Sequence, residues 1–268
     1  MKICTSYFQS EYIRNQVQEI RYSMTALTPA LEYAERHPEK KVIIEIFSLD
    51  DDKLPKIDKL HSLQQEHENI YYDFYILSDL VTYSKTFGRT PTHIMCHQPA
   101  TTWGLIQILM YYNVSDISID EPLIFNVADI AANVRSKGIN IRIRPNIAKN
   151  RYEKEMETDD GIRHFWVLPQ HLNFYEEYVD VLDLIDNNTE REAAVVQAYL
   201  SNKPYDASLS LLVEGIEKDV GASFIDDRFV IRRLNCGQTC MKNTNYCHYC
   251  DMMMRMYDIA AARHASSN

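Results

Sequence analysis

Residues 138–146 read GINIRIRPN, and residues 114–123 read VSDISIDEPL. Both segments alternate isoleucine with polar or charged residues, which is the period-two pattern of a β-strand with two different faces. In the later segment Asn140, Arg142 and Arg144 share one face, and the isoleucines share the other. The pattern predicts two strands that each turn an apolar face toward packed helices and a polar face the other way.

Similar β-rich runs alternate with helical stretches along most of the chain. The predicted strands cover residues 3–8, 42–49, 71–77, 93–97, 116–120, 139–144, 164–168 and 179–185. Eight strands separated by helices imply parallel pairing, because each crossover returns the chain to the same edge of the sheet. Residues 11–39 are predicted to be helical, with a break near Pro29.

Two sheet architectures fit this order. One is an open, doubly wound sheet, and the other is a closed (β/α)8 TIM-like barrel. Even spacing of the units and the lack of a glycine-rich phosphate loop after the first strand favour the barrel, and 268 residues suit that fold. We therefore predict a barrel over residues 1–205 and a C-terminal extension over residues 206–268 that packs on it.

The polar face of residues 139–144 must point into such a barrel, because the isoleucine face has to pack on the outer helices. A lone charge inside a barrel is costly and needs a partner. We predict that Arg142 and Arg144 point inward and pair with carboxylates. The expected partners are Asp120, Glu45 and Asp183.

The carboxyl ends of the fourth to sixth predicted strands carry candidate site residues, since barrel enzymes keep their active sites at this end. Arginine is suited to clamping an anionic group, and histidine exchanges protons near neutral pH. The same residues also fit a closed ion network that only fills the barrel. The candidate catalytic residues are His97, Asp120, Glu121 and Arg144, and the candidate substrate-binding residues are Gln98 and Asn146.

Four of the six cysteines lie close together near the C-terminus, at Cys236, Cys240, Cys247 and Cys250. Four thiolates in so short a segment can surround one metal ion, and a final Cys-x2-Cys pair is common in metal sites. We predict a Zn²⁺ site, with a 4Fe–4S cluster as the alternative. The cysteine spacing of radical-initiating iron–sulfur proteins is absent, because six residues separate Cys240 from Cys247.

Composition restricts the partners and the location of the chain. A formal charge of −10 argues against a protein that coats nucleic acid over its whole surface. Basic residues after Arg228, with Tyr246 and Tyr249 among them, still predict a local nucleic-acid contact, although they also fit a role in keeping a small metal module soluble. We expect no membrane span and no signal peptide, and so a cytoplasmic location in a bacterial or phage-infected cell.

Residues 114–123 and 138–146, together with the four-cysteine set, resemble the U32 "peptidase" group of barrel proteins from bacteria and their phages. The resemblance implies a barrel that holds a cysteine-ligated cluster. In some relatives it also implies oxygen insertion into RNA bases or quinone precursors, or a collagenase-like peptidase. Here the cysteines are compact and C-terminal rather than spread through the chain, so only their ligand role is carried over.

Two classes of function remain open. The first is a metal-containing barrel enzyme that modifies RNA or another anionic substrate. The second is a non-catalytic, metal-stabilised binding or assembly protein of phage type with a silent barrel. A deep polar mouth favours the enzyme, and a mouth plugged by side chains favours the binding protein.

Overall fold

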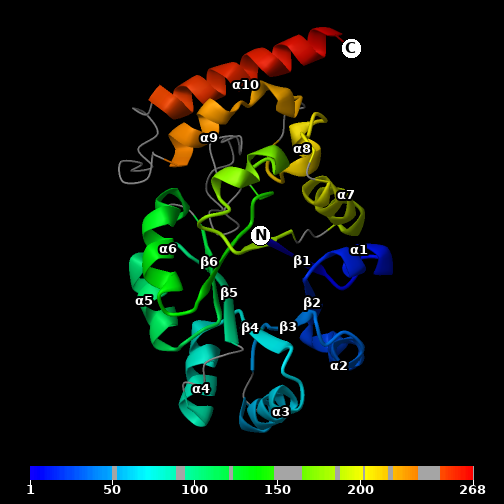
Figure 1. The fold of residues 1–268 in the computed structure, drawn as a ribbon, viewed down its shortest axis with the longest axis vertical. Helices are drawn as coiled ribbons and strands as arrows, with labels where there is room; N and C mark the ends of the chain where they lie inside the picture. Colours follow the sequence, from blue (N-terminus) through cyan, green and yellow to red (C-terminus); the bar gives the residue numbers. More distant parts are fainter. Residues whose placement is uncertain are drawn as a thin grey trace.

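The computed structural model describes residues 1–49, 53–88, 94–120, 123–147, 165–184, 188–201, 203–216, 220–234 and 248–267. Within them eight parallel strands form a closed barrel in chain order (Figure 1). The first strand pairs with the second on one side and with the eighth on the other, which closes the ring. The α/β barrel expected from the alternating strands and helices is therefore confirmed.

The strands are β1 Lys2–Ser6, β2 Glu19–Ser23, β3 Lys41–Ile46, β4 Ile70–Phe74, β5 Ile94–Ala100, β6 Asp116–Ile119, β7 Asn140–Ile143 and β8 Val181–Asp183. The helices are α1 Glu11–Gln16, α2 Leu27–Arg36, α3 Lys53–Glu66, α4 Leu77–Phe87, α5 Trp103–Tyr111, α6 Val127–Arg135, α7 Thr189–Leu200, α8 Leu209–Leu212, α9 Asp227–Leu234 and α10 His248–Ser267. Short 3-10 turns η1 Met24–Ala26, η2 Leu123–Asn126, η4 Pro169–Phe174 and η5 Ala222–Phe224 complete the described elements.

Local sequence explains several helix ends. The side chain of Asn188 caps α7 by accepting from the backbone N–H groups of Glu190 and Arg191, and Thr102 caps α5 in the same way through Leu105. Gly138, just after α6, has φ of 72°, a conformation that suits glycine. These ends set the lengths of the connections that return the chain to the barrel.

The apolar core lies between the strands and the surrounding helices, whereas much of the barrel interior is polar. In β7, Ile141 and Ile143 are fully buried in the apolar core cluster. Arg142, between them, is also buried but forms ion pairs inside the barrel. The predicted alternation of this strand, with isoleucines outward and Arg142 inward, is confirmed.

The predicted number of strands, eight, agrees with the described residues, but two assignments were wrong. β2 lies inside the stretch that was predicted to be helical. The strand was missed because it has only five residues and lies between two helices, α1 and α2. Residues 165–168 are buried but form no strand. Val167 instead bonds to Pro145 and Tyr199. A short apolar run without alternation does not reveal its backbone partners.

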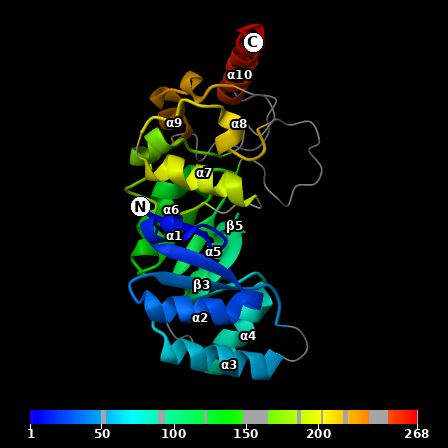
Figure 2. The same ribbon diagram turned by 90° about the vertical axis from the view of Figure 1, so that its right-hand side faces the viewer.

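The C-terminal helices pack on one side of the barrel, away from α3 and α4 (Figures 1 and 2). α9 contacts η2 and η4, and α10 contacts η5. Tyr257 of α10 is fully buried and faces Phe224 at a ring distance of 6.1 Å. In the described part of the β7–β8 connection the helical element is the short η4, and α9 covers it.

The predicted metal ligands lie mostly outside this description. Cys236, Cys240 and Cys247 are not among the described residues, and Cys250 is described only as part of the α10 backbone. None of the described helices combines the length and the apolar character that crossing a bilayer requires.

Candidate functional site

The centre of the barrel holds a buried arginine with three carboxylate partners. Arg142 donates from the Nε/Nη2 edge of its guanidinium to both carboxylate oxygens of Asp183, with Nε–Oδ2 and Nη2–Oδ1 distances of 3.1 and 2.7 Å. Its Nη1 lies 2.6 Å from Glu19 Oε2 and 3.2 Å from Asp116 Oδ1. The paired planar geometry is one that arginine offers and lysine does not.

A second arginine extends this network toward the carboxyl ends of the strands. Arg21 pairs with Asp73, and it lies 3.4 Å from Asp183 Oδ1 and 3.6 Å from Glu45 Oε1. Burial acts to raise the pKa of Asp183, but the charges of Arg142 and Arg21 outweigh it and hold that pKa well below its usual value. The carboxylate of Asp183 is therefore ionised at neutral pH.

Glu45 stands at the end of this network nearest the carboxyl mouth. Its side chain is 14% exposed and accepts a hydrogen bond of 3.0 Å from the Tyr75 hydroxyl. Burial raises the pKa of Glu45, and the charge of Asp73 adds to that effect, while Arg21 and Arg144 oppose it. A partly exposed carboxyl group with a raised pKa at a barrel mouth is a candidate proton donor or acceptor.

Arg144 follows Arg142 by two residues, just past the end of β7, and is partly buried. Its charge lowers the pKa values of Glu45 and Asp183, which places it within electrostatic reach of both. Of the three carboxylates predicted as partners of the inward-facing arginines, Glu45 and Asp183 are therefore within electrostatic reach of Arg144. Asp120 follows β6 and donates its backbone N–H to Ala100 at 3.2 Å, which ties it to the end of β5.

Asn146 has an unusual environment for an amide. It is fully buried, and neither its Oδ1 nor its Nδ2 has a hydrogen-bond partner. Its backbone oxygen accepts from Glu214 at 2.8 Å, which fixes this part of the chain. A buried polar group without a partner costs about 1–3 kcal/mol, so such groups in folded proteins usually meet water, an ion or a ligand.

Exposed aromatic side chains surround the same mouth. Phe8 follows β1, Phe47 follows β3 and Trp103 follows β5, with exposed fractions of 64%, 48% and 38%. All three lie at the carboxyl end because the strands are parallel. The Phe47 ring lies 4.3 Å from the ring of Tyr75, which links this rim to Glu45. Exposed aromatic rings are suited to stacking on bases.

The predicted site residues are described to different extents. Asp120, Arg144 and Asn146 follow the adjacent strands β6 and β7, so the fold brings them to one end of the barrel. His97 and Gln98 belong to β5, but their side chains are outside the described part, as is the whole of Glu121. Sequence reasoning missed Tyr75 and the aromatic rim, and treated Glu45 only as a partner for an arginine.

One signal in the sequence pointed to Glu45. Residues 42–47 read VIIEIF, in which a single carboxylate interrupts an otherwise apolar strand. The alternation alone places Glu45 on the same face as Ile43, and Ile43 is inside the barrel with Cys4 and Val181. Among the described residues, no cluster of three or more His, Cys, Asp or Glu side chains is arranged to hold a metal ion.

Comparison with known proteins adds little to this geometry. No family model and no curated protein sequence matches the chain. Among solved structures, the chain is similar to a 4-hydroxy-2-oxoglutarate/2-dehydro-3-deoxyphosphogluconate aldolase, with 12% identity and a TM-score of 0.40. That match covers 75% of this chain and 93% of the aldolase. A likeness this distant carries no information on the activity of the present chain.

Proposed function

We propose that the protein is a barrel enzyme that binds RNA or another anionic, base-containing substrate at the carboxyl mouth and modifies it. The observation that carries the proposal is Asn146, whose fully buried amide has no hydrogen-bond partner at this mouth. A substrate group, or water that a substrate displaces, would complete its hydrogen bonds. Amides that are left unsatisfied in the free protein are suited to reading the polar edge of a ligand.

The rim gives the substrate class. Phe8, Phe47 and Trp103 supply exposed rings for stacking, and Arg144 supplies a fork of donors for an anionic group. The resemblance of residues 114–123 and 138–146 to the U32 group supports RNA within this class. The aromatic rings would then stack on a base of the RNA. The Asn146 amide would contact the sugar, and Arg144 would bind a phosphate.

Glu45 is the group we assign to proton transfer, because its raised pKa keeps it able to exchange a proton closer to neutral pH than an ordinary glutamate. Tyr75 holds it through a hydrogen bond. His97, Asp120 and Glu121 remain proposed catalytic residues, and Gln98 remains a proposed substrate contact. Each of them lies in or directly after β5 or β6.

We further propose that Cys236, Cys240, Cys247 and Cys250 hold one Zn²⁺ ion, or a 4Fe–4S cluster as the alternative, in the cytoplasm of a bacterial or phage-infected cell. The support is their compact spacing in the sequence. A site with four protein thiolates leaves no open position on zinc, so its role would be structural. Basic residues near it would add a nucleic-acid contact outside the barrel.

Tryptophan fluorescence tests substrate binding directly, because the chain has two tryptophans in contrasting environments. Trp103 is 38% exposed at the mouth, and Trp166 is 4% exposed. Titration with short single-stranded RNA should quench the fluorescence of Trp103. The Trp103→Phe variant, which keeps Trp166 and an aromatic ring, should bind RNA but lose the quenching. Equal quenching in both proteins would contradict binding at this rim.

Modification is tested in cells, where unidentified co-substrates are supplied. RNA from cells that express the wild type is digested and compared by nucleoside mass spectrometry with RNA from cells that express Arg144→Lys. Lysine keeps the charge and loses the fork, so a nucleoside of altered mass should appear with the wild type and be reduced at least about tenfold with the variant. Identical nucleosides in both would exclude RNA modification.

Removal of the metal is tested by Cys247→Ser with metal analysis of protein purified without oxygen. We expect loss of bound metal and a lower melting temperature, because metal-binding energy contributes to folding energy. Lys242→Ser, in the same segment, is the control and should keep the metal. Disulfides among these cysteines in fresh, metal-free wild type would overturn the proposal.

A non-catalytic binding protein is the second candidate, and one observation favours it. The barrel interior is filled by the ion pairs of Arg21 and Arg142, which leave little room for a substrate inside. In that case RNA binding would persist in the fluorescence titration while the nucleosides stayed unchanged. The two experiments together therefore separate the enzyme from the binding protein.

A further inference from the structure

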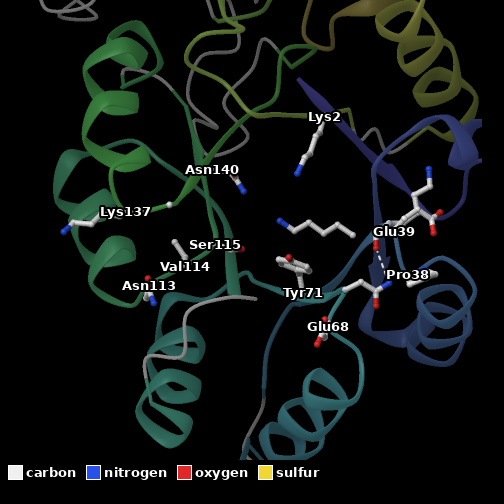
Figure 3. A pocket seen from close by; sticks show the side chains of 14 residues that line it. Lys2, Pro38, Glu39, Glu68, Tyr71, Asn113, Val114, Ser115, Lys137 and Asn140 are labelled. Carbon is white, nitrogen blue, oxygen red and sulfur yellow. Dashed lines mark hydrogen bonds between the residues drawn. The ribbon is translucent and has the colours of Figure 1, made fainter.

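The opposite, amino-terminal mouth of the barrel contains a cavity of about 560 Å³ (Figure 3). Its lining comes from the starts of several strands, including Lys2 of β1, Lys41 of β3, Tyr71 of β4 and Asn140 of β7. This volume falls within the range of small-molecule sites, about 300–1,000 Å³. The site proposed above lies at the other end of the strands and shares none of these residues.

At the floor of the cavity, the positive charge of Lys41 is balanced by the negative charge of Asp116. Lys41 Nζ lies 2.5 Å from Asp116 Oδ2 and 3.9 Å from Glu19 Oε1, and it sits 4.0 Å from the centroid of the Tyr71 ring. Burial acts to raise the pKa of Asp116, but Lys41 and Arg142 outweigh it and lower that pKa. The ammonium of Lys41 is therefore already neutralised by an ionised carboxylate.

Lys2 differs from the other lysines at this mouth. No acidic side chain of the described residues lies within ion-pair distance of Lys2, and Figure 3 shows its side chain reaching into the cavity, as does Asn140. Lys40 instead donates to the backbone oxygens of Asn15 and Val17. Lys137 points away from the cavity in the same view. Lys2 therefore offers a ligand an ammonium group that no carboxylate of the described residues neutralises.

Two acidic residues, Glu39 and Glu68, also line this mouth and act in the opposite direction. Glu39 Oε1 lies 3.6 Å from His37 Nδ1, a contact that is an ion pair only when the histidine is protonated. Helix C-termini also face this end of the barrel, but their partial negative charge fades within the last turn. The cavity lining still carries four lysines (Lys2, Lys40, Lys41 and Lys137) against these two glutamates, which favours an anionic group.

We infer that the amino-terminal mouth binds a small phosphorylated or carboxylated molecule, with its anionic group on Lys2. Asn140 and Ser115 line the same cavity and carry polar atoms for hydroxyl groups of the ligand. Tyr71 bounds the floor, and because burial raises the pKa of Tyr71, its hydroxyl stays protonated and carries no competing negative charge. The cavity is larger than a bare phosphate ion, which points to an organic anion.

The test is an NMR titration of isotope-labelled full-length protein with glycerol 3-phosphate, at constant ionic strength, with glycerol as the neutral counterpart. Amide signals of residues 39–41, 69–71 and 113–115 should move with the phosphate compound and not with glycerol. Signals of residues 144–147, at the other mouth, should stay in place. Shifts only at the carboxyl mouth, equal shifts with glycerol, or no shifts would overturn the inference.

The matched variants are Lys2→Gln and Lys137→Gln, which remove the same charge from the same mouth. Lys2→Gln should weaken binding of glycerol 3-phosphate about tenfold or more, because it removes a charge-assisted hydrogen bond. Lys137→Gln should leave the affinity within about twofold, since only long-range attraction is lost. Unchanged melting temperatures for both variants exclude an effect on folding. Equal weakening in the two variants would overturn the assignment to Lys2.

Discussion

The two mouths of the barrel are built from the same strands but carry different side chains. β3 places Lys41 at the amino mouth and Glu45 near the carboxyl mouth, and Asn140 begins β7 whereas Arg144 lies just past its end. Residues four apart in a strand are separated by about 13 Å. A strand that alternates strictly can therefore present different chemistry to each end, while a layer of ion pairs fills the middle.

The central layer of ion pairs contacts the side chains of both mouths. Arg142 contacts Asp116, which also holds Lys41 at the amino mouth, and it contacts Asp183, which also holds Arg21 toward the carboxyl mouth. Each mouth is thereby fixed against the same buried centre. Changes in the centre should affect both ends, whereas changes at one mouth should stay local.

The largest expected effect comes from removing the centre of the layer. Arg142→Met leaves Glu19, Asp116 and Asp183 without their common partner and should lower the free energy of unfolding by about 3–5 kcal/mol. Denaturant unfolding measures the change. The control is Arg135→Met, which breaks the half-exposed pair with Asp180 and should cost about 1 kcal/mol or less. Similar losses in the two variants would show that the buried ion pairs of Arg142 contribute no more to stability than the half-exposed pair of Arg135.

A smaller effect of opposite sign is expected at the carboxyl mouth. Asn146→Leu replaces an unsatisfied buried amide by an apolar group and should raise the free energy of unfolding by about 1 kcal/mol, while it weakens RNA binding. Calorimetry and the Trp103 titration measure the two quantities. The exposed Asn133→Leu should change stability by less than about 0.5 kcal/mol. Destabilisation by Asn146→Leu would mean that the amide already has a partner in the free protein.

The smallest expected effect is on the pH dependence of stability, and it arises at the contact between η4 and α9, away from both mouths. His171 of η4 is buried, and its Nε2 lies 3.4 Å from Asp227 of α9. Burial lowers the pKa of His171, and Asp227 partly offsets this. Because the unfolded chain then binds a proton more readily, this contribution to stability is present above about pH 6.5 and declines as the pH falls below it.

His171→Gln should make the melting temperature less dependent on pH between about 7.5 and 5.5, the range that spans an ordinary histidine. His61→Gln, at a partly buried histidine beside Tyr83, provides the comparison. A pH dependence that is unchanged by His171→Gln and lost in His61→Gln would contradict the assignment. RNA binding and phosphate binding should persist in His171→Gln at neutral pH.

Sequence reasoning was strongest where one strand has two different faces. The alternation of residues 138–146 was sufficient to place Arg142 inside the barrel, and the predicted partner Asp183 does pair with it. It failed at β2, because a five-residue strand between two helices gives too short a signal. Because β2 was not recognised, Glu19 and Arg21 were not identified as members of the central ion network.

The candidate site shows a similar division. Asp120, Arg144 and Asn146 follow strands that the sequence defines well, so their common end of the barrel could be predicted. The aromatic rim could not, because Phe8, Phe47 and Trp103 are far apart in the chain and become neighbours of one mouth only through barrel closure. The lack of a partner for the Asn146 amide also depends on contacts that no local pattern encodes.

The sequence by itself determined the parallel pairing of the strands, the polar inner face of β7 and the compact spacing of the four cysteines, since each follows from patterns along the chain. Only the tertiary structure decided which carboxylates neutralise Arg21 and Arg142, and that no acidic side chain in the described part of the chain pairs with Lys2 at the amino mouth. The reason is physical. Alternation and spacing are local properties, whereas charge pairing and burial depend on which distant strands the closed barrel brings together.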